Sequence, residues 1–272
     1  SAVGDTTAFV AVDVREVEAS RAEGGGVHTV LSLATEVDPA WVPELFPRRV
    51  AETTGLVWDG EERAVLEETA LRFGGLALRR QRRPPTDPVA ASQVLVDRVV
   101  AGELRLQRWD DVVDGWLARV RCVAGWFPER GLLTYDDDEC AVVIAEIVGH
   151  AWRWSAVRQA PCIDHVRNAL SWADQQFVEK MAPEKIRLPA GYGMRIQYAP
   201  GEPPRGRARI QDFYGLTETP RIASGRVGLL LEILAPNQRP AQVTDDLAGF
   251  WERTYPELKK ELSRRYPKHE WR

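Results

Sequence analysis

Polar and apolar residues alternate along much of the first third of the chain, which is the period-two pattern of half-buried strands. The alternating segments are residues 7–17, 27–34, 49–58, 64–73 and 76–82. Glu23-Gly24-Gly25-Gly26 separates the first two and predicts a hairpin reversal, and residues 41–46 predict one short helix. Five strands with one helix suit a small closed barrel of the OB type, because closure removes exposed strand edges.

Between residues 88 and 180 apolar residues recur at helical spacing instead. The predicted helices are residues 90–100, 109–127, 137–148 and 164–181. Six of the ten tryptophans lie in this region, Trp109, Trp116 and Trp126 among them. Such side chains could stack on nucleobases, but tryptophans at helical spacing are more often core residues, and we favour the core interpretation.

The last third of the chain mixes both patterns. Strands are predicted at residues 185–188, 192–198 and 205–210, and the largely apolar run 227–234 fits a buried central strand. The whole chain therefore predicts an α+β fold. Its three parts are an N-terminal OB-like β-barrel (residues 1–87), a central helical segment (88–180) and a basic, mixed α/β C-terminal domain (181–272).

The predicted strands of the last third carry cations on defined faces. Tyr192, Met194, Ile196 and Tyr198 share one face of their strand, and Arg195 lies on the other. The next strand places Arg205, Arg207 and Arg209 together on one face. Such a row could track a phosphate backbone beside a stacking tyrosine, or it could be a solvated face paired with Glu202 or Asp212.

The boundary between the first two predicted parts is also basic. Arg79-Arg80-Gln81-Arg82-Arg83 ends the last strand, and Pro84-Pro85-Thr86-Asp87-Pro88 follows as a stiff linker. The four arginines could grip phosphates, or they could simply form a solvated strand end.

Residues 239–269 predict two short capped helices. Thr244 offers a cap to the first, and Thr254-x-x-Glu257 forms a capping box for the second. Phe250 and Trp251 belong to the apolar face of the first helix, and Tyr255 begins the apolar stripe of the second.

Composition places the chain among soluble globular proteins. Of its 272 residues 44% are hydrophobic and 28% charged, and no apolar run is long enough to cross a bilayer. Three cysteines without a C-x-x-C pair argue against a disulfide framework and fit a reducing, cytoplasmic location. The opening Ser1-Ala2 indicates a fragment or a tagged protein.

The charge is unevenly distributed along the chain. The net charge is −4, yet residues 181–272 hold 16 lysines and arginines against 11 acidic residues. A basic last third behind an acidic body indicates a localised surface for anions.

Catalytic motifs are missing from the sequence. There is no G-x-x-x-x-G-K-[ST] loop for a triphosphate, no G-x-S-x-G elbow and no H-E-x-x-H helix. Asp136-Asp137-Asp138-Glu139 is better explained as an acidic helix start than as a metal site, and Cys162 with His165 lacks a second ligand pair. We therefore predict no catalytic residue, cofactor or metal, and no ATP hydrolysis by this chain alone.

A resemblance adds to this picture. It rests on Thr219-Pro220-Arg221-Ile222, Gly225-Arg226-Val227, Leu229-Leu230-Leu231, Arg239-Pro240, Gln242-Val243-Thr244, Asp246-Leu247-Ala248-Gly249-Phe250-Trp251 and Arg265-Tyr266-Pro267-Lys268-His269. These residues resemble the C-terminal region of bacterial DExH-box ATP-dependent RNA helicases of the HrpB type, most densely over about residues 185–272. The resemblance implies the non-motor half of such a helicase, whose class carries an OB-like module after the motor.

The function predicted on these grounds is a non-catalytic accessory region that binds or guides single-stranded RNA or DNA beside absent motor domains. The candidate nucleic-acid contacts are Arg195, Tyr198, Arg207 and Arg209 from the strand pattern, with Arg221, Arg226, Arg239 and Lys268 carried over from the resemblance. For those last four residues a structural salt-bridging role remains open.

A second interpretation belongs to a different class. The apolar face around Phe250, Trp251 and Tyr255 could dock the motor domains or another protein, since buried aromatic anchors dominate many interfaces. Exposure of Trp251 decides between docking and simple packing.

Overall fold

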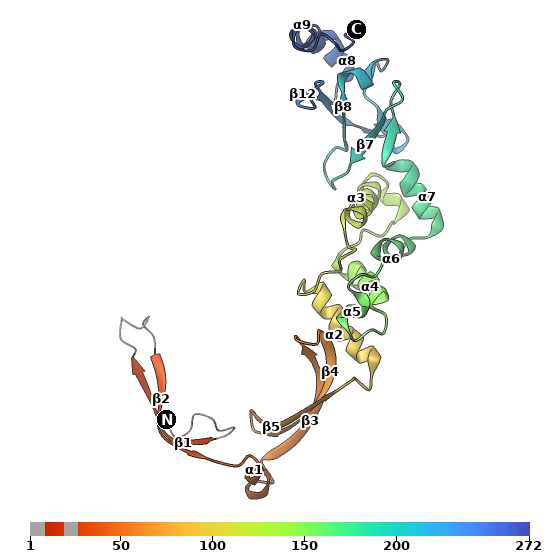
Figure 1. Cartoon of the computed structure of the whole chain (residues 1–272). Helices are drawn as coiled ribbons and strands as arrows, with labels where there is room; N and C mark the ends of the chain where they lie inside the picture. The colour runs from red at the N-terminus through yellow and green to blue at the C-terminus, as the bar shows by residue number, and fades with distance from the viewer. Residues whose placement is uncertain (1–8, 19–26) are drawn as a thin grey trace. The chain divides into compact units, whose positions relative to one another are not determined.

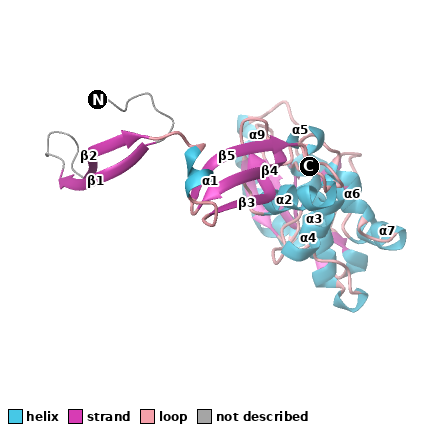
Figure 2. Cartoon of the chain, turned by 90° about the horizontal axis from the view of Figure 1, so that it is seen from below, coloured by secondary structure: helices cyan, strands magenta, loops and turns pink. Residues whose placement is uncertain are grey.

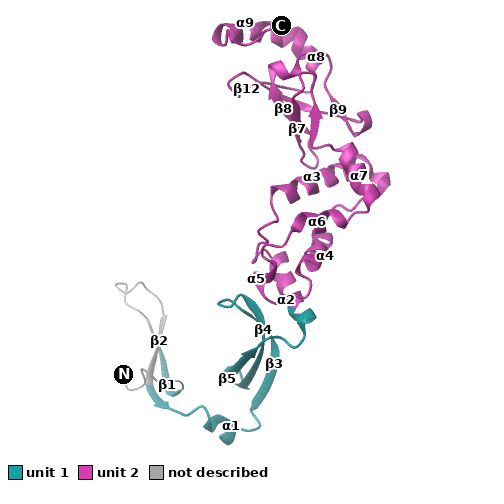
Figure 3. Ribbon diagram, turned by 45° about the vertical axis from the view of Figure 1, so that its right-hand side comes forward, with its two compact units in different colours: residues 1–91 teal, residues 92–272 magenta. Residues whose placement is uncertain are grey.

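The chain divides into two compact units, Ser1–Ala91 and Ser92–Arg272 (Figure 3). The computed structural model describes residues 9–18 and 27–272, so the predicted reversal at Glu23-Gly24-Gly25-Gly26 lies outside the described residues. The predicted division into three parts, with its second boundary at residue 180, stays a prediction.

The first unit contains the predicted strands, each within two residues of its predicted bounds (Figure 1). Strands β1 (Phe9–Glu18) and β2 (Val27–Glu36) pair antiparallel, and helix α1 (Trp41–Leu45) follows them. Strands β3 (Val50–Asp59), β4 (Ala64–Phe73) and β5 (Leu76–Arg83) form a second antiparallel sheet with β4 in the middle.

The predicted OB-like barrel is wrong. Within residues 9–18 and 27–83 the strands form two separate sheets, one of two strands and one of three, and neither closes on itself. Alternation fixes which residues form a strand and which face each residue takes, but pairing partners are set by contacts distant in sequence. The fold is therefore mixed α and β without a closed barrel in this part of the chain.

A series of helices follows β5 and continues into the second unit, and Figure 2 shows helices in cyan. They are α2 (Pro88–Val100), α3 (Asp111–Trp126), α4 (Asp137–Val148), α5 (Trp154–Val157), α6 (Cys162–Asn168) and α7 (Trp172–Met181), with a 3-10 turn η2 (Pro128–Arg130). The predicted helix 164–181 is split, because the Ser171 side chain accepts from the Asp174 N–H and starts α7 afresh. Asp136 and Glu139 form a capping box, which confirms the acidic helix start.

The tryptophans of this region divide between core and surface. Trp116 and Trp154 are buried, as the core interpretation expects, whereas Trp172 is largely exposed. The guanidinium carbon of Arg119 also lies over the Trp116 ring, 5.3 Å from the ring centroid.

A five-stranded sheet follows, in the spatial order β12-β11-β8-β7-β6. Its strands are β6 (Lys185–Arg187), β7 (Gly193–Gln197), β8 (Arg205–Arg209), β11 (Leu230–Leu234) and β12 (Pro240–Thr244). All neighbours pair antiparallel except β8 and β11, which run parallel. The chain reaches β11 through a 3-10 turn η3 (Ile210–Phe213), strand β9 (Arg221–Ile222), a second turn η4 (Ala223–Gly225) and strand β10 (Val227–Gly228).

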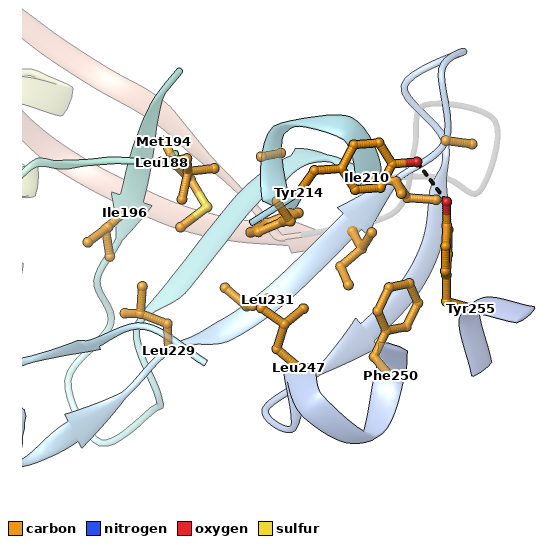
Figure 4. Packing of buried hydrophobic residues seen from close by; sticks show 14 of the residues in the cluster. Leu188, Met194, Ile196, Ile210, Tyr214, Leu229, Leu231, Leu247, Phe250 and Tyr255 are labelled. Carbon is orange, nitrogen blue, oxygen red and sulfur yellow. Dashed lines mark hydrogen bonds between the residues drawn. The ribbon is translucent and has the colours of Figure 1, made fainter. Parts of the chain in front are cut away.

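One face of this sheet carries the core of its part of the chain (Figure 4). Met194 and Ile196 of β7 and Leu231 and Ile233 of β11 are buried there. The C-terminal segment supplies further members of the same cluster, Leu247, Phe250, Tyr255 and Leu262. The strand predicted at residues 227–234 is found at 230–234 and lies inside the sheet. It is buried on one face only, since Leu231 and Ile233 are buried whereas Leu230 and Glu232 are half-buried.

The C-terminal segment is one helical run, not two separately capped helices. It consists of α8 (Leu247–Gly249), a π-helical stretch η5 (Phe250–Thr254) and α9 (Tyr255–Arg265). Asp246 caps its start by accepting from the Gly249 N–H, whereas Thr254 has helical dihedral angles and makes no capping hydrogen bond. The predicted capping box is wrong because the backbone passes through Thr254 without unwinding.

Candidate nucleic-acid interface

The second face of the five-stranded sheet is open and basic. Residues on β6, β7 and β8 alternate between buried and exposed, and paired residues on neighbouring strands share a face. The exposed face thereby collects the six cations Lys185, Arg187, Arg195, Arg205, Arg207 and Arg209. We call these six residues the basic face.

A single carboxylate, Glu232 of β11, lies on this face among the strand residues, directly beside Arg207 in the parallel register. Its pairing with Arg207 is long, with 3.6 Å between the guanidinium Nε and the carboxylate oxygen. The face therefore keeps a clear positive excess.

The β8 arginines have partners that differ in strength. Arg205 pairs with Glu202 at 3.1 Å with both side chains more than half exposed, a geometry that contributes little stability. Arg207 also donates to the Gln238 carbonyl at 3.3 Å. Arg209 is more firmly held, since the buried Asp212 accepts from its main-chain N–H and from its guanidinium.

The other three cations lack such partners. Within the described residues no hydrogen bond or ion pair involves the side chains of Lys185, Arg187 or Arg195, and all three are exposed. Sequence reasoning singled out Arg195 and missed Lys185 and Arg187. The alternation in Lys185-Ile186-Arg187 was the available signal, because it places both cations on the face opposite the half-buried Ile186.

Tyr198, the predicted stacking residue, makes contacts within the protein instead. The Tyr198 hydroxyl donates to the Pro183 carbonyl at 2.7 Å, and its ring packs 6.2 Å from that of Trp126. Burial raises the pKa of this phenol far above its ordinary value. Tyr192 is different, since it is 45% exposed and lies at the end of the sheet beside Arg207 and Arg209.

Arg221 and Arg226, carried over from the resemblance, make structural contacts. Arg221 donates to the carbonyls of Gly225 and Arg226 and so closes its own turn. Arg226 donates to the Trp126 carbonyl at 3.1 Å and to Glu129, and its guanidinium lies 4.2 Å from the Phe127 ring centre. These contacts favour the salt-bridging and positioning role that the sequence left open.

Arg239 and Lys268 are exposed, and no side-chain partner is found for either among the described residues. Arg239 follows Gln238 in the β11–β12 loop, whereas Lys268 follows α9, whose Leu262 packs into the core on the buried face of the sheet. Only Arg239 is thus near the basic face in sequence and topology.

Of the three candidate docking residues, Phe250 and Tyr255 are buried and Trp251 is half-buried. Phe250 is 2% exposed, and Tyr255 shares a 2.7 Å hydrogen bond with Tyr214 (Figure 4). Trp251 is half-buried and donates its indole N–H to the Leu216 carbonyl. By the exposure criterion these contacts favour packing over docking.

Other predicted features carry no site. Arg82 pairs with Glu68 and Asp59, and Arg83 with Glu67, so these two arginines belong to a paired strand end.

Among the described residues no cluster of metal-ligating side chains occurs, and none of the described helices has the length and apolar character of a membrane span. Burial raises the pKa of the Cys122 thiol to about 11, which keeps it protonated and unreactive.

The chain resembles known proteins in both sequence and structure. Residues 144–272 match the family described as ATP-dependent helicase C-terminal. The ATP-dependent RNA helicase HrpB of Escherichia coli strain K12 is 28% identical over 246 residues, covering 89% of this chain and 30% of that protein.

Two solved structures are similar to most of the chain. The E. coli DExH-box NTPase HrpB aligns with a TM-score of 0.66 and 27% identity over 97% of this chain and 32% of its own. The E. coli DEAH/RHA helicase HrpB aligns with a TM-score of 0.58 and 28% identity over 82% and 29% of the two chains. The chain thus spans about 30% of the length of the relatives it matches, and the predicted resemblance to the C-terminal region is confirmed.

Proposed function

We propose that this chain, which corresponds to the C-terminal region of HrpB-type ATP-dependent helicases, holds single-stranded nucleic acid on its basic face. The relative is described as an RNA helicase, and RNA is therefore the strand we propose first. In the parent protein this surface would guide the strand beside the motor domains, which drive the reaction. This chain itself has no catalytic step to perform.

The observation that supports the proposal is the open face of the five-stranded sheet. Three neighbouring strands present six cations, and three of them, Lys185, Arg187 and Arg195, have no partner among the described residues. Unpaired cations in register can neutralise successive phosphates and release their counterions, which favours binding without sequence preference.

A competing explanation is that the charges only protect an edge strand. β6 is the outermost strand, and lysine and arginine on edge strands discourage aggregation by edge-to-edge pairing. That explanation accounts for Lys185 and Arg187 but not for Arg195, Arg205 and Arg207, which lie on interior strands. The continuation of the charge across interior strands favours anion binding.

The test is fluorescence anisotropy of a labelled single-stranded RNA titrated with this chain at several salt concentrations. We expect affinity to fall as salt rises. The slope of log K against log salt is negative. Arg195→Ala and Arg187→Ala should each reduce its magnitude by about 0.7, since each removes one phosphate contact.

Lys260→Ala is the matched control. It removes one exposed cation from α9, which packs against the buried face of the sheet, and it should leave the salt slope unchanged. If Lys260→Ala changed the salt slope as much as Arg195→Ala, net charge alone would explain the binding. Absence of binding by the unmodified chain at low salt would refute the proposal.

A further inference from the structure

A pocket of about 380 Å³ opens at one end of the basic face. It lies where the parallel strands β8 and β11 end and where the β6–β7 and β11–β12 loops turn. Its lining includes Tyr192, Arg207, Arg209, Asp212, Leu234 and Gln238. This volume is within the range that small-molecule groups occupy in proteins.

The lining combines three kinds of group. Tyr192 supplies an aromatic ring that is nearly half exposed. Arg207 supplies a half-exposed guanidinium that pairs with Glu232 at 3.6 Å and donates to the Gln238 carbonyl at 3.3 Å, two long contacts that a phosphate can replace. Asp212 supplies a buried carboxylate at the edge of the same space.

The Asp212 carboxylate has remaining hydrogen-bonding capacity. Its Oδ2 accepts from the Arg209 main-chain N–H at 3.1 Å and from the Arg209 Nε at 3.3 Å. Its Oδ1 accepts only one long contact, at 3.4 Å from the Arg209 guanidinium. A carboxylate has about four acceptor positions, so Oδ1 can still accept from an N–H donor in the pocket.

We infer that this pocket holds one nucleotide of the bound strand, and the inference rests on the proposed function. The base stacks on the Tyr192 ring and presents an N–H to Asp212, while its phosphate binds Arg207. An aromatic ring beside a guanidinium recognises the two constant parts of every nucleotide, the flat base and the charged phosphate. The basic face thereby gains one position that distinguishes a nucleotide strand from a simple polyanion.

The test compares two strands of equal length, an oligoadenylate and a ribose-phosphate oligomer in which every base is replaced by an abasic spacer. Both carry the same phosphates, and only the first can stack. We expect the unmodified chain to prefer the oligoadenylate by about 5- to 150-fold, the range that one stacked base supplies.

Variants assign that preference to a residue. Tyr192→Leu should abolish most of it, Tyr192→Phe should keep it, and Arg195→Ala should weaken both strands by the same factor. Trp172→Leu is the matched control, because Trp172 is an exposed aromatic residue of α7 and its loss should keep the preference.

The outcomes separate the inference from the proposed function. If both strands bind equally well, or if Tyr192→Leu retains the preference, the nucleotide pocket is refuted and phosphate binding by the basic face stands. If neither strand binds at low salt, the proposed function fails, and the inference fails with it.

Discussion

Glu67 of β4 anchors the proline-rich segment that follows β5. Its carboxylate accepts hydrogen bonds from the Thr86 hydroxyl and the Thr86 main-chain N–H, and it pairs with Arg83. These donors, with Thr86 first and Arg83 second, lower the pKa of Glu67 from 4.5 to about 2. The segment predicted as a stiff linker is therefore also attached to the sheet at Thr86.

This lowered pKa predicts an acid-dependent loss of stability. Because the folded pKa lies below the unfolded one, the stabilisation is present above about pH 4.5 and is lost as pH falls toward 2. Glu67→Gln should remove that part of the pH dependence. The measurement is the thermal midpoint by circular dichroism from pH 2 to 7, with Glu52→Gln on the exposed part of β3 as control. An unchanged profile in Glu67→Gln would contradict the assignment.

Among the elements, β8 shows how the cationic row depends on one glycine. Gly206 lies between Arg205 and Arg207 and faces the core. A Cβ built there would lie 2.5 Å from the terminal carbon of Met194, which is fully buried. A larger residue there would force the Met194 side chain to move within the core.

Gly206→Ala should therefore destabilise the chain by about 1–3 kcal/mol through overpacking. Gly193→Ala in β7 is the matched control, since the nearest atom to its Cβ is 3.9 Å away, and its effect should stay within about 0.5 kcal/mol. Urea unfolding gives both values. A further variant, Gly206→Ala with Met194→Val, should recover part of the loss, and no recovery would place the strain elsewhere.

The sequence predicted elements far better than it predicted their partners. Alternation at Met194, Arg195 and Ile196 identified both the strand and its cationic face, because period two follows from local backbone geometry. The same reasoning could not show that β1 and β2 form one sheet while β3, β4 and β5 form another. Pairing depends on contacts between distant residues, which alternation does not encode.

The candidate site was predictable in the same partial sense. Arg207 and Arg209 were identified from spacing alone, and the pairing with Asp212 that the sequence left open is found for Arg209. Nothing in the sequence showed that Tyr198 is turned inward. The apolar side chains of Phe250 and Tyr255 likewise gave no sign of whether they met core or solvent. Periodicity identifies a face, and only tertiary packing decides what covers it.

For the molecule as a whole, two arginines join the helices to the five-stranded sheet within the second unit. The buried Arg119 of α3 donates to the Ala182 carbonyl at 2.6 Å and pairs with Glu179 and Glu184. Arg226 reaches from the sheet region back to the end of α3. These contacts cross the boundary predicted at residue 180.

Residues 88–272 alone should therefore unfold in one cooperative transition. Circular dichroism and tryptophan fluorescence should give coincident urea curves, since the buried Arg119 bonds to residues on both sides of that boundary. Arg272→Ala is a suitable control for the effect of removing an exposed ion pair. Arg272 and its partner Glu270 are both well exposed, so the free energy of unfolding should fall only slightly. Two separate transitions would instead support independent helical and C-terminal domains.

The register of β6 against β7 sets Lys185 directly opposite Arg195. Like charges in such cross-strand pairs repel and weaken the sheet that carries them. Selection for folding alone would replace one of them with a neutral or acidic side chain. If the basic face binds a strand, its charges are kept against that pressure, and the most stable version of this protein would also be a poorer binder.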